Sequence, residues 1–260
     1  MIDILRQEKE AIIGAASRKI LWIMTAMLLM TVAIIWMARE VISPDVGLLA
    51  RENPKTTAFI ELRKAQWRQK GLEKTPYQRW VPYDKISPYL TMAVTIAEDD
   101  GFWWHGGLDL EAIRNALETN LGKGKIKFGG STITQQLAKN MYLTPEKTAR
   151  RKMVEAALAI RMERTMSKRR ILELYLNVVE WGDGVFGADA AARRWFGVGA
   201  RNLTPEQAAR LAAVLPSPLK LDPTKDGGYV ERRAGQLVEE MKKRGLLWGA
   251  GDYKKPTPGE

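Results

Sequence analysis

The order of apolar and polar positions separates an uninterrupted apolar run near the N-terminus from a long region with helical periods. No residue from Ile20 to Ala38 is charged. A helix rises about 1.5 Å per residue, so this run comes close to spanning a hydrocarbon core of roughly 30 Å. It predicts one transmembrane helix over residues 20–38. A cleavable signal peptide is the competing interpretation, but the run is longer than a typical signal core and no small-x-small cleavage site precedes Arg39.

The residues that flank this run favour one orientation. Trp22 and Trp36 lie near its two ends, where indole rings favour the membrane interface. Cations are more numerous before the run (Arg6, Lys9, Arg18 and Lys19) than after it (Arg39, Arg51 and Lys55). Because cytoplasmic flanks carry the excess of Lys and Arg, we expect residues 1–19 to form a cytoplasmic tail and the main domain to lie on the opposite side.

Residues 39–83 are polar and basic, and we expect them to form a connector and membrane-proximal segment. Four steps into proline interrupt regular structure there, at Ser43-Pro44, Asn53-Pro54, Thr75-Pro76 and Val81-Pro82. A short helix is predicted from about Thr57 to Lys70.

Residues 84–250 show mostly helical periods and are predicted to form one mainly α catalytic domain, followed by a C-terminal tail over residues 251–260. Ser87-Pro88 caps a predicted helix that runs to about Glu98. Further start and stop signals predict helices from Asp109 to Gly122, from a capping box of Thr132 and Gln135, and over about Pro145 to Met166, Ser167 to Val178, Ala188 to Phe196, Pro205 to Leu215 and Gly228 to Arg244. Strand periods are scarce.

The composition narrows the chemistry. Forty-one Lys and Arg against thirty Asp and Glu give a formal charge of +11, which favours an anionic partner such as phosphate, nucleic acid or a phospholipid surface. The charge alone does not choose among them. Cysteine is absent, which excludes a disulfide framework and thiolate chemistry, and the single histidine excludes a metal site built from a histidine cluster.

Glu98 is the first candidate for acid–base chemistry. If its helix ends there, the negative end of the helix dipole and the adjacent Asp99 and Asp100 all oppose its ionisation. The bulky rings of Phe102 and its tryptophan neighbours indicate a partly desolvated site. A raised pKa suits a general acid or base; the alternative is a solvated acidic helix end.

His105 is the only histidine, and we favour a structural hydrogen-bonding role for it. No serine or cysteine motif accompanies it, and no cluster of metal-ligating residues surrounds it.

The segment from Gly129 to Gln136 places two glycines before a capped helix start. Free backbone N–H groups and the dipole at such a position attract anions. The amides, the hydroxyls and Lys139 one turn later favour contact with a ligand over an ordinary loop-to-helix junction. The preceding GKGKIKF (residues 122–128) is basic and is expected to be mobile, as suits a segment that orders over substrate.

The following predicted helix carries Lys147, Arg151 and Glu155 at a spacing of four residues, with Lys152 alongside. A salt-bridged, solvated helix face is the alternative interpretation. Nearby apolar positions (Met153, Ala156, Ala157 and Ile160) predict the buried side, with Glu155 at its border. A partly buried acid flanked by cations indicates a site that stabilises the charge of a phosphate.

Five motifs in this order resemble those of the peptidoglycan glycosyltransferase family, the module found in class A penicillin-binding proteins and in stand-alone enzymes. AEDDGFWWHGGLD resembles the ED-x-x-F-x-x-H-x-G motif, and GGSTITQQLAKN, RKMVE, KRRILELYLN and GVFGADAAARRWFG resemble the second to the fifth. They cover residues 98–197, nearly the whole catalytic domain. Because few residues follow them, we expect no transpeptidase domain, and EWGDGVFG with LPSPLK resembles the monofunctional biosynthetic transglycosylases of Gram-negative type.

The resemblance implies a lysozyme-like helical domain with a small membrane-proximal lobe, which polymerises lipid II into glycan strands. The inverting transfer would release undecaprenyl diphosphate. Glu98 corresponds to the general base and Glu155 to the second glutamate, which stabilises the diphosphate region. The remaining correspondences are diphosphate-contacting cations (Lys139, Lys147, Arg151 and Lys152) and polar donor-site contacts (Ser131 and Gln136).

The chain departs from the family pattern at three positions. Lys147 stands where arginine is common, so bidentate phosphate contact is lost there. Trp195 replaces a usual tyrosine and Val198 a usual lysine.

The resemblance also implies a single-pass protein of the bacterial inner membrane with its catalytic domain in the periplasm. Expected partners are lipid II, the growing strand, membrane lipids and other cell-wall synthesis proteins, but not nucleic acid. The sequence requires no cofactor and shows no metal-ligating cluster; the family allows a divalent cation, Mg²⁺ or Mn²⁺, near Glu155. The alternatives are a lysozyme-like or lytic peptidoglycan hydrolase, which needs no cation cluster, and a non-catalytic membrane-anchored scaffold.

Overall fold

A computed structural model of the protein describes residues 2–123, 130–146 and 148–245. The chain divides into two compact units, residues 1–44 and residues 45–260, and each is described separately.

The first unit consists of helix α1 (Ile2–Ile42), which extends beyond both ends of the predicted membrane span. Its apolar side chains are exposed on every face, as Leu21 at 65% and Leu28 at 63% illustrate. Within the span, the hydroxyls of Thr25 and Thr31 donate to backbone carbonyls one turn earlier, both at 2.8 Å, so they carry no unpaired donor. Among the described residues this is the one helix long and apolar enough to cross a membrane.

The second unit is mainly helical, as the sequence predicts. Its helices are α2 (Val46–Leu49), α3 (Ala58–Gln69), α4 (Pro88–Glu98), α5 (Leu110–Lys123), α6 (Ile133–Tyr142), α7 (Ala149–Thr165), α8 (Lys168–Val178), α9 (Ala188–Phe196), α10 (Pro205–Val214) and α11 (Gly228–Lys243), with 3-10 turns η1 (Tyr83–Lys85) and η2 (Ala200–Asn202).

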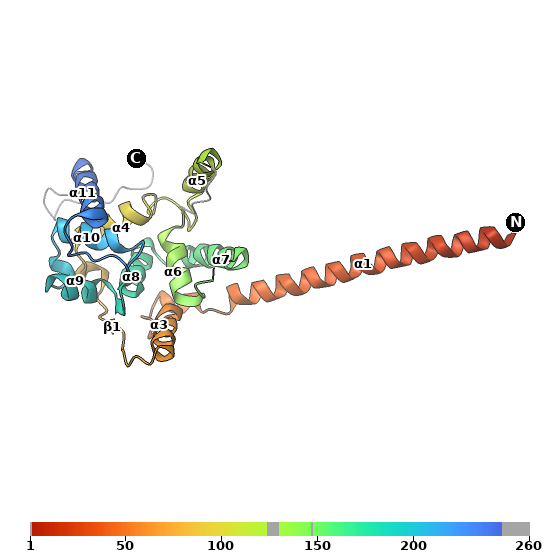
Figure 1. The fold of residues 1–260 in the computed structure, drawn as a ribbon, viewed down its shortest axis with the longest axis horizontal. Helices are drawn as coiled ribbons and strands as arrows, with labels where there is room; N and C mark the ends of the chain where they lie inside the picture. The colour runs from red at the N-terminus through yellow and green to blue at the C-terminus, as the bar shows by residue number, and fades with distance from the viewer. Residues whose placement is uncertain (1, 124–129, 147, 246–260) are drawn as a thin grey trace. The chain divides into compact units, whose positions relative to one another are not determined.

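Helix α8 lies at the centre of this unit. Seven of its residues are buried (Ile171, Leu172, Leu174, Tyr175, Leu176, Asn177 and Val178). A helix that is apolar on most of its faces is stable only where other elements cover those faces. Helices α6, α7 and α9 pack against it. Figure 1 shows α8 between α9 on one side and the α6–α7 pair on the other.

Helices α4, α10 and α11 form a second packed group, in which α10 contacts both of the others and α4 also contacts α11. In Figure 1 α4 lies beside α10 and α11, and its last residue, Glu98, accepts a hydrogen bond from Gln136 of α6. The C-terminal end of α4 therefore lies between the two helical groups.

A small sheet completes the unit. Strand β1 (Tyr77–Gln78) pairs in parallel with β3 (Val185–Phe186), and β3 pairs antiparallel with β2 (Glu180–Gly182). Gly184 in the β2–β3 turn has φ +78°, and a Cβ there would meet the Trp67 ring at 2.6 Å. Glycine therefore allows both the turn and the close approach of α3.

One predicted helix start differs from the observed one, and one predicted helix cap does not form. The helix predicted from Pro145 begins at Ala149, because the Thr148 side chain caps it by accepting from the Arg151 N–H. Ser87 precedes α4 as predicted, but its hydroxyl donates to the Leu203 carbonyl at 3.1 Å and makes no cap. Pro88 at the first helical position therefore marks the start of α4 without a side-chain cap.

The predicted connector contributes to the second unit. Its residues from 45 onward belong to that unit, and α3 packs against α6. The Arg63 guanidinium donates to both carboxylate oxygens of Glu180, at 2.9 and 2.7 Å, and thereby ties α3 to β2. The predicted boundaries at residues 84 and 250 remain predictions, and the predicted tail, residues 251–260, lies outside the described residues.

Candidate functional site

Glu98 is the last residue of α4, and its carboxylate is half-buried between helices. The Gln136 side-chain amide on α6 donates to its Oε2 at 2.8 Å, and the Tyr175 hydroxyl on α8 donates to the Gln136 Oε1 at 2.9 Å. Burial is the main cause that raises the pKa of Glu98, and the Gln136 hydrogen bond is the largest effect that opposes it. The raised pKa agrees with the prediction, although the charge of the neighbouring Asp99 contributes less than burial does.

A pocket of about 390 Å³ opens beside Glu98, within the range of small-molecule sites. It is lined by Ala97, Glu98, Ala212, Ala213, Pro216, Tyr229, Arg233 and Gln236. The aromatic residues that follow Glu98 are absent from this lining. Phe102 is fully buried and Trp104 is 52% exposed, so α10 and α11, rather than the predicted rings, form the wall of this pocket.

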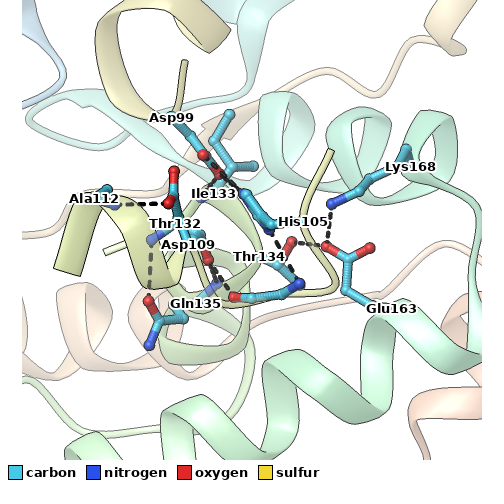
Figure 2. Close-up of polar contacts among 11 residues, drawn as sticks. Asp99, His105, Asp109, Ala112, Thr132, Ile133, Thr134, Gln135, Glu163 and Lys168 are labelled. Carbon is cyan, nitrogen blue, oxygen red and sulfur yellow. Dashed lines mark hydrogen bonds and ion pairs between the residues drawn. The ribbon is translucent and has the colours of Figure 1, made fainter. Parts of the chain in front are cut away.

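His105 has the structural role that the sequence favours. Its Nδ1 accepts from the Gly107 N–H at 3.1 Å, so its Nε2 carries the proton and donates to Asp99 Oδ1 at 2.9 Å. Asp99 Oδ2 accepts from the Ile133 N–H at 2.8 Å. Figure 2 shows Asp99 between His105 and the start of α6. The pair thus joins the end of α4 to the start of α6.

Most of the N–H groups at the start of α6, which the sequence analysis expected to attract an anion, are paired within the protein. Thr132 and Gln135 form the predicted capping box, in which Gln135 N donates to Thr132 Oγ1 and Thr132 N donates to Gln135 Oε1, both at 3.1 Å. The Ile133 N–H is occupied by Asp99. The capping groups visible in Figure 2 therefore fix the start of the helix and occupy these N–H groups.

A group of charged and polar side chains lies where α6 and α7 face each other. We call it the cation cluster; its members are Ser131, Lys139, Arg151, Lys152 and Glu155. The Glu155 carboxylate on α7 is 2% exposed and accepts from Arg151 and from Lys152. The Lys152 ammonium also donates to Ser131 Oγ at 2.6 Å. The structure therefore brings together four of the residues that the sequence nominated.

The buried side of α7 is not the predicted one. Met153 is 54% exposed, and Ala156, Ala157 and Ile160 are only partly buried. The buried positions are Val154, Glu155, Leu158, Ala159 and Met162. Glu155 consequently lies within the buried face instead of at its border. A buried carboxylate is costly unless it is paired, and Arg151 and Lys152 provide that pairing.

Lys139 on α6 reaches the cluster from the opposite helix. Burial is the main cause that lowers its pKa; Arg151 and Lys152 act in the same direction, while Glu155 and Glu98 oppose them. Its ammonium lies 5.5 Å from the centre of the Phe59 ring of α3. Lys139 is therefore a partly desolvated cation within electrostatic reach of both glutamates.

The structure does not place the remaining predicted positions at the site. Lys147 lies outside the described residues, as does most of the predicted basic segment over 122–128. Trp195 packs against Gly182 of β2, where an added Cβ would meet the indole at 2.7 Å. Neither Trp195 nor Val198 lines the pocket beside Glu98.

The donor set at Glu155 does not fit a metal ion held by the protein. Both of its carboxylate oxygens accept from cationic side chains. Within residues 2–123, 130–146 and 148–245, no three or more His, Cys, Asp or Glu side chains are grouped to hold a metal. The neighbouring charges are positive, which disfavours a divalent cation.

Sequence reasoning missed two residues of the site. Tyr175 was part of a helical motif but gave no sign that its hydroxyl reaches Gln136. Arg233, more than a hundred positions after Glu98, lines the same pocket and lowers the pKa of Glu98 by its charge. No local signal connects such distant residues.

Comparisons with known proteins agree with this geometry. The Transglycosylase family model matches residues 65–242. A biosynthetic peptidoglycan transglycosylase of Nitrosospira multiformis is 47% identical over 189 residues, which are 73% of this chain and 82% of the relative. The enzyme of the same description from Aromatoleum aromaticum is 52% identical over 170 residues, 65% of this chain and 74% of the relative. The cation cluster, the capped start of α6 and the end of α4 that carries Glu98 all lie within the matched residues, and the chain belongs to the peptidoglycan transglycosylase family.

Proposed function

We propose that this enzyme polymerises lipid II into glycan strands by inverting transfer, with release of undecaprenyl diphosphate. One observation supports this most: a half-buried carboxylate, Glu98, lies within electrostatic reach of Lys139, which also faces Arg151, Lys152 and Glu155. A base on one side and clustered cations on the other match a reaction that removes a proton from one sugar and a diphosphate from the next.

Glu98 is proposed as the general base. Its carboxylate takes the proton of the acceptor hydroxyl, whose oxygen forms the new bond to the anomeric carbon of the donor sugar. The bond from that carbon to the diphosphate breaks, and the diphosphate leaves with the electron pair. Because burial raises the pKa of Glu98, the carboxylate is a better proton acceptor than a solvated glutamate.

The cation cluster is proposed to stabilise the departing diphosphate. Lys139 gains most from an arriving anion, because partial burial limits the solvation of its ammonium. Arg151 and Lys152 share one carboxylate, Glu155, so three cations face a single internal counter-charge in the cluster. Cations positioned beforehand stabilise charge more in the transition state than in the ground state. Ser131 is proposed to contact the donor from its position beside Lys152.

The pocket beside Glu98 is proposed to receive a sugar ring of one substrate. Its alanines and proline provide an apolar surface, while Tyr229, Arg233 and Gln236 provide an aromatic face and polar groups. Such a lining suits a pyranose, which has both apolar and hydroxyl-bearing faces.

The proposed location is the bacterial inner membrane. Helix α1 has the length and composition of a single-pass anchor, and the distribution of cations favours a cytoplasmic N-terminus with a periplasmic catalytic domain. An anchor holds the site at the surface where a lipid-linked substrate resides. The division into tail, membrane helix, connector and glycosyltransferase domain is part of this proposal.

The test is product analysis with the purified full-length protein. Lipid II should give polymer and released undecaprenyl diphosphate, with inversion at the new linkage by NMR. Shortening of preformed glycan without polymer would support a lytic hydrolase. Polymer at an undiminished rate from Glu98→Gln would contradict the assignment of the base.

A further inference from the structure

Tyr175 and Gln136 connect the core of the second unit to the Glu98 carboxylate. Tyr175 is completely buried on α8. Its hydroxyl donates to Gln136 Oε1 at 2.9 Å, and Gln136 Nε2 donates to Glu98 Oε2 at 2.8 Å. Three helices, α8, α6 and α4, each contribute one group to this line. The resemblance to the family implies a different role for Gln136, a direct contact with the donor sugar.

The Tyr175 hydroxyl determines which end of the amide faces Glu98. An amide carries a donor end and an acceptor end, whereas an ionised carboxylate only accepts. With the Tyr175 hydroxyl donating to the amide oxygen, the N–H₂ group faces Glu98. If the Gln136 side-chain amide were flipped, its oxygen would face a Glu98 carboxylate oxygen, and both of these atoms are acceptors. A hydroxyl held in the core therefore favours the amide orientation that suits the ionised base.

We propose that Tyr175 and Gln136 are positioning residues for Glu98: the Tyr175 hydroxyl holds the Gln136 amide so that its N–H orients the Glu98 carboxylate and favours the ionised form that accepts a proton. This inference rests on the proposed function, in which Glu98 is the base. It assigns Gln136 to the base instead of to the donor sugar.

The other groups around Glu98 do not supply the same contact. Arg233 from α11 and Lys139 from α6 lower the pKa of Glu98 through their charge, and Asp99 raises it. Helix α10 contributes only alanines to the surrounding pocket. Burial raises the pKa, and the Gln136 hydrogen bond opposes burial more than either cation does. Loss of this bond should leave a larger share of Glu98 protonated at the low end of the working pH range.

The experiment is a pH profile of initial rates of lipid II polymerisation with full-length protein. Tyr175→Phe keeps the packing of the ring and removes the hydroxyl. Its acid limb should move to higher pH, with a loss of about tenfold at the low-pH end and a high-pH plateau within about twofold of the parent. The matched control is Tyr142→Phe, a half-buried tyrosine at the end of α6; its profile should coincide with that of the parent.

Gln136→Met provides a second variant, because methionine keeps the length of the side chain and removes the N–H. Its acid limb should move in the same direction and further than that of Tyr175→Phe. If Gln136 instead contacts the donor, KM for lipid II will rise equally at every pH and the Tyr175→Phe limb will stay in place, which overturns the proposal. Should Tyr175→Phe fail to fold, Gln136→Met alone decides.

The activity of the parent protein distinguishes a failure of the proposed function from a failure of the positioning roles. A parent that makes no polymer contradicts the proposed function itself. A parent that polymerises lipid II, with variants whose acid limbs coincide with its own, contradicts only the positioning roles of Tyr175 and Gln136.

Discussion

Asp99→Asn should destabilise the second unit, because this buried carboxylate accepts from two separate donors. Its side chain is 1% exposed. His105 Nε2 lies 2.9 Å from Oδ1 and 3.1 Å from Oδ2, and the Ile133 N–H lies 2.8 Å from Oδ2. An asparagine side chain has one acceptor oxygen, so its amide N–H₂ must oppose one of these donors. His105 has no alternative tautomer, because its Nδ1 already accepts from Gly107.

The expected loss follows from the unpaired donor. A buried donor without a partner costs about 1–3 kcal/mol, and bonds to a charged group lie at the upper end. For a domain of this size, about 1 kcal/mol corresponds to roughly 2–4 °C in Tm. Asp99→Asn should therefore lower Tm by about 5–10 °C in a thermal melt of the full-length protein in detergent.

Asp100→Asn is the matched control, since it makes the same chemical change at the next residue. The Asp100 side chain is 58% exposed, and its partner Arg244 is 38% exposed. Solvent screens such a pair, which contributes about 0–1 kcal/mol, so its Tm should fall by no more than about 3 °C. Equal Tm values for the two variants would refute the conclusion that Asp99 joins α4 to α6.

Further substitutions test the site and the packing of the second unit. Lys139→Met should slow polymerisation by about a hundredfold in a steady-state assay, since it removes the desolvated cation; retention of most activity would exclude Lys139 from the diphosphate site. Arg151→Ala and Lys152→Ala should each slow polymerisation by roughly tenfold or more, with the far-UV circular dichroism of the parent, and a variant that unfolds would show its charge to be structural. Gly187→Ala should lower Tm by several degrees, because Gly187 has φ +87° and an added Cβ would lie 2.8 Å from the Asn177 carbonyl oxygen; an unchanged Tm would contradict that packing.

Local signals predicted the helices well because the groups involved are neighbours in sequence. The Thr132–Gln135 capping box needs only four consecutive residues, and it forms as predicted. Helix α9 has the predicted bounds from Ala188 to Phe196. Strands β1 and β3 have two residues each, which is too short for a period-2 pattern to reveal them.

The sequence could not decide which face of α7 is buried. Apolar residues occur on two faces of this helix, and the predicted set that includes Met153 has the same helical spacing as the buried set that includes Val154, Leu158 and Met162. Periodicity identifies an apolar stripe but does not choose between two stripes. Packing against α6 and α8 makes that choice.

The raised pKa of Glu98 was predicted in direction, and desolvation was one of its predicted causes beside the helix dipole and two adjacent aspartates. Burial is the largest cause in the structure, but the residues predicted to provide it, the rings that follow Glu98, do not line the pocket. The pocket wall beside Glu98 comes from α10 and α11, more than a hundred residues later. In the same way, the hydrogen bond from Gln136 to Glu98 depends on how α6 packs between α4 and α8, which no local pattern encodes.

The central claim is that Glu98 is the base of a lipid II polymerase, and one comparison of rates tests it most directly. Initial rates of polymer formation from lipid II should be measured for the parent, for Glu98→Gln and for Glu206→Gln, which makes the same change at an exposed position of α10. Glu98→Gln should fall by about a hundredfold or more, while Glu206→Gln should match the parent. Equal rates for the two variants would contradict the account.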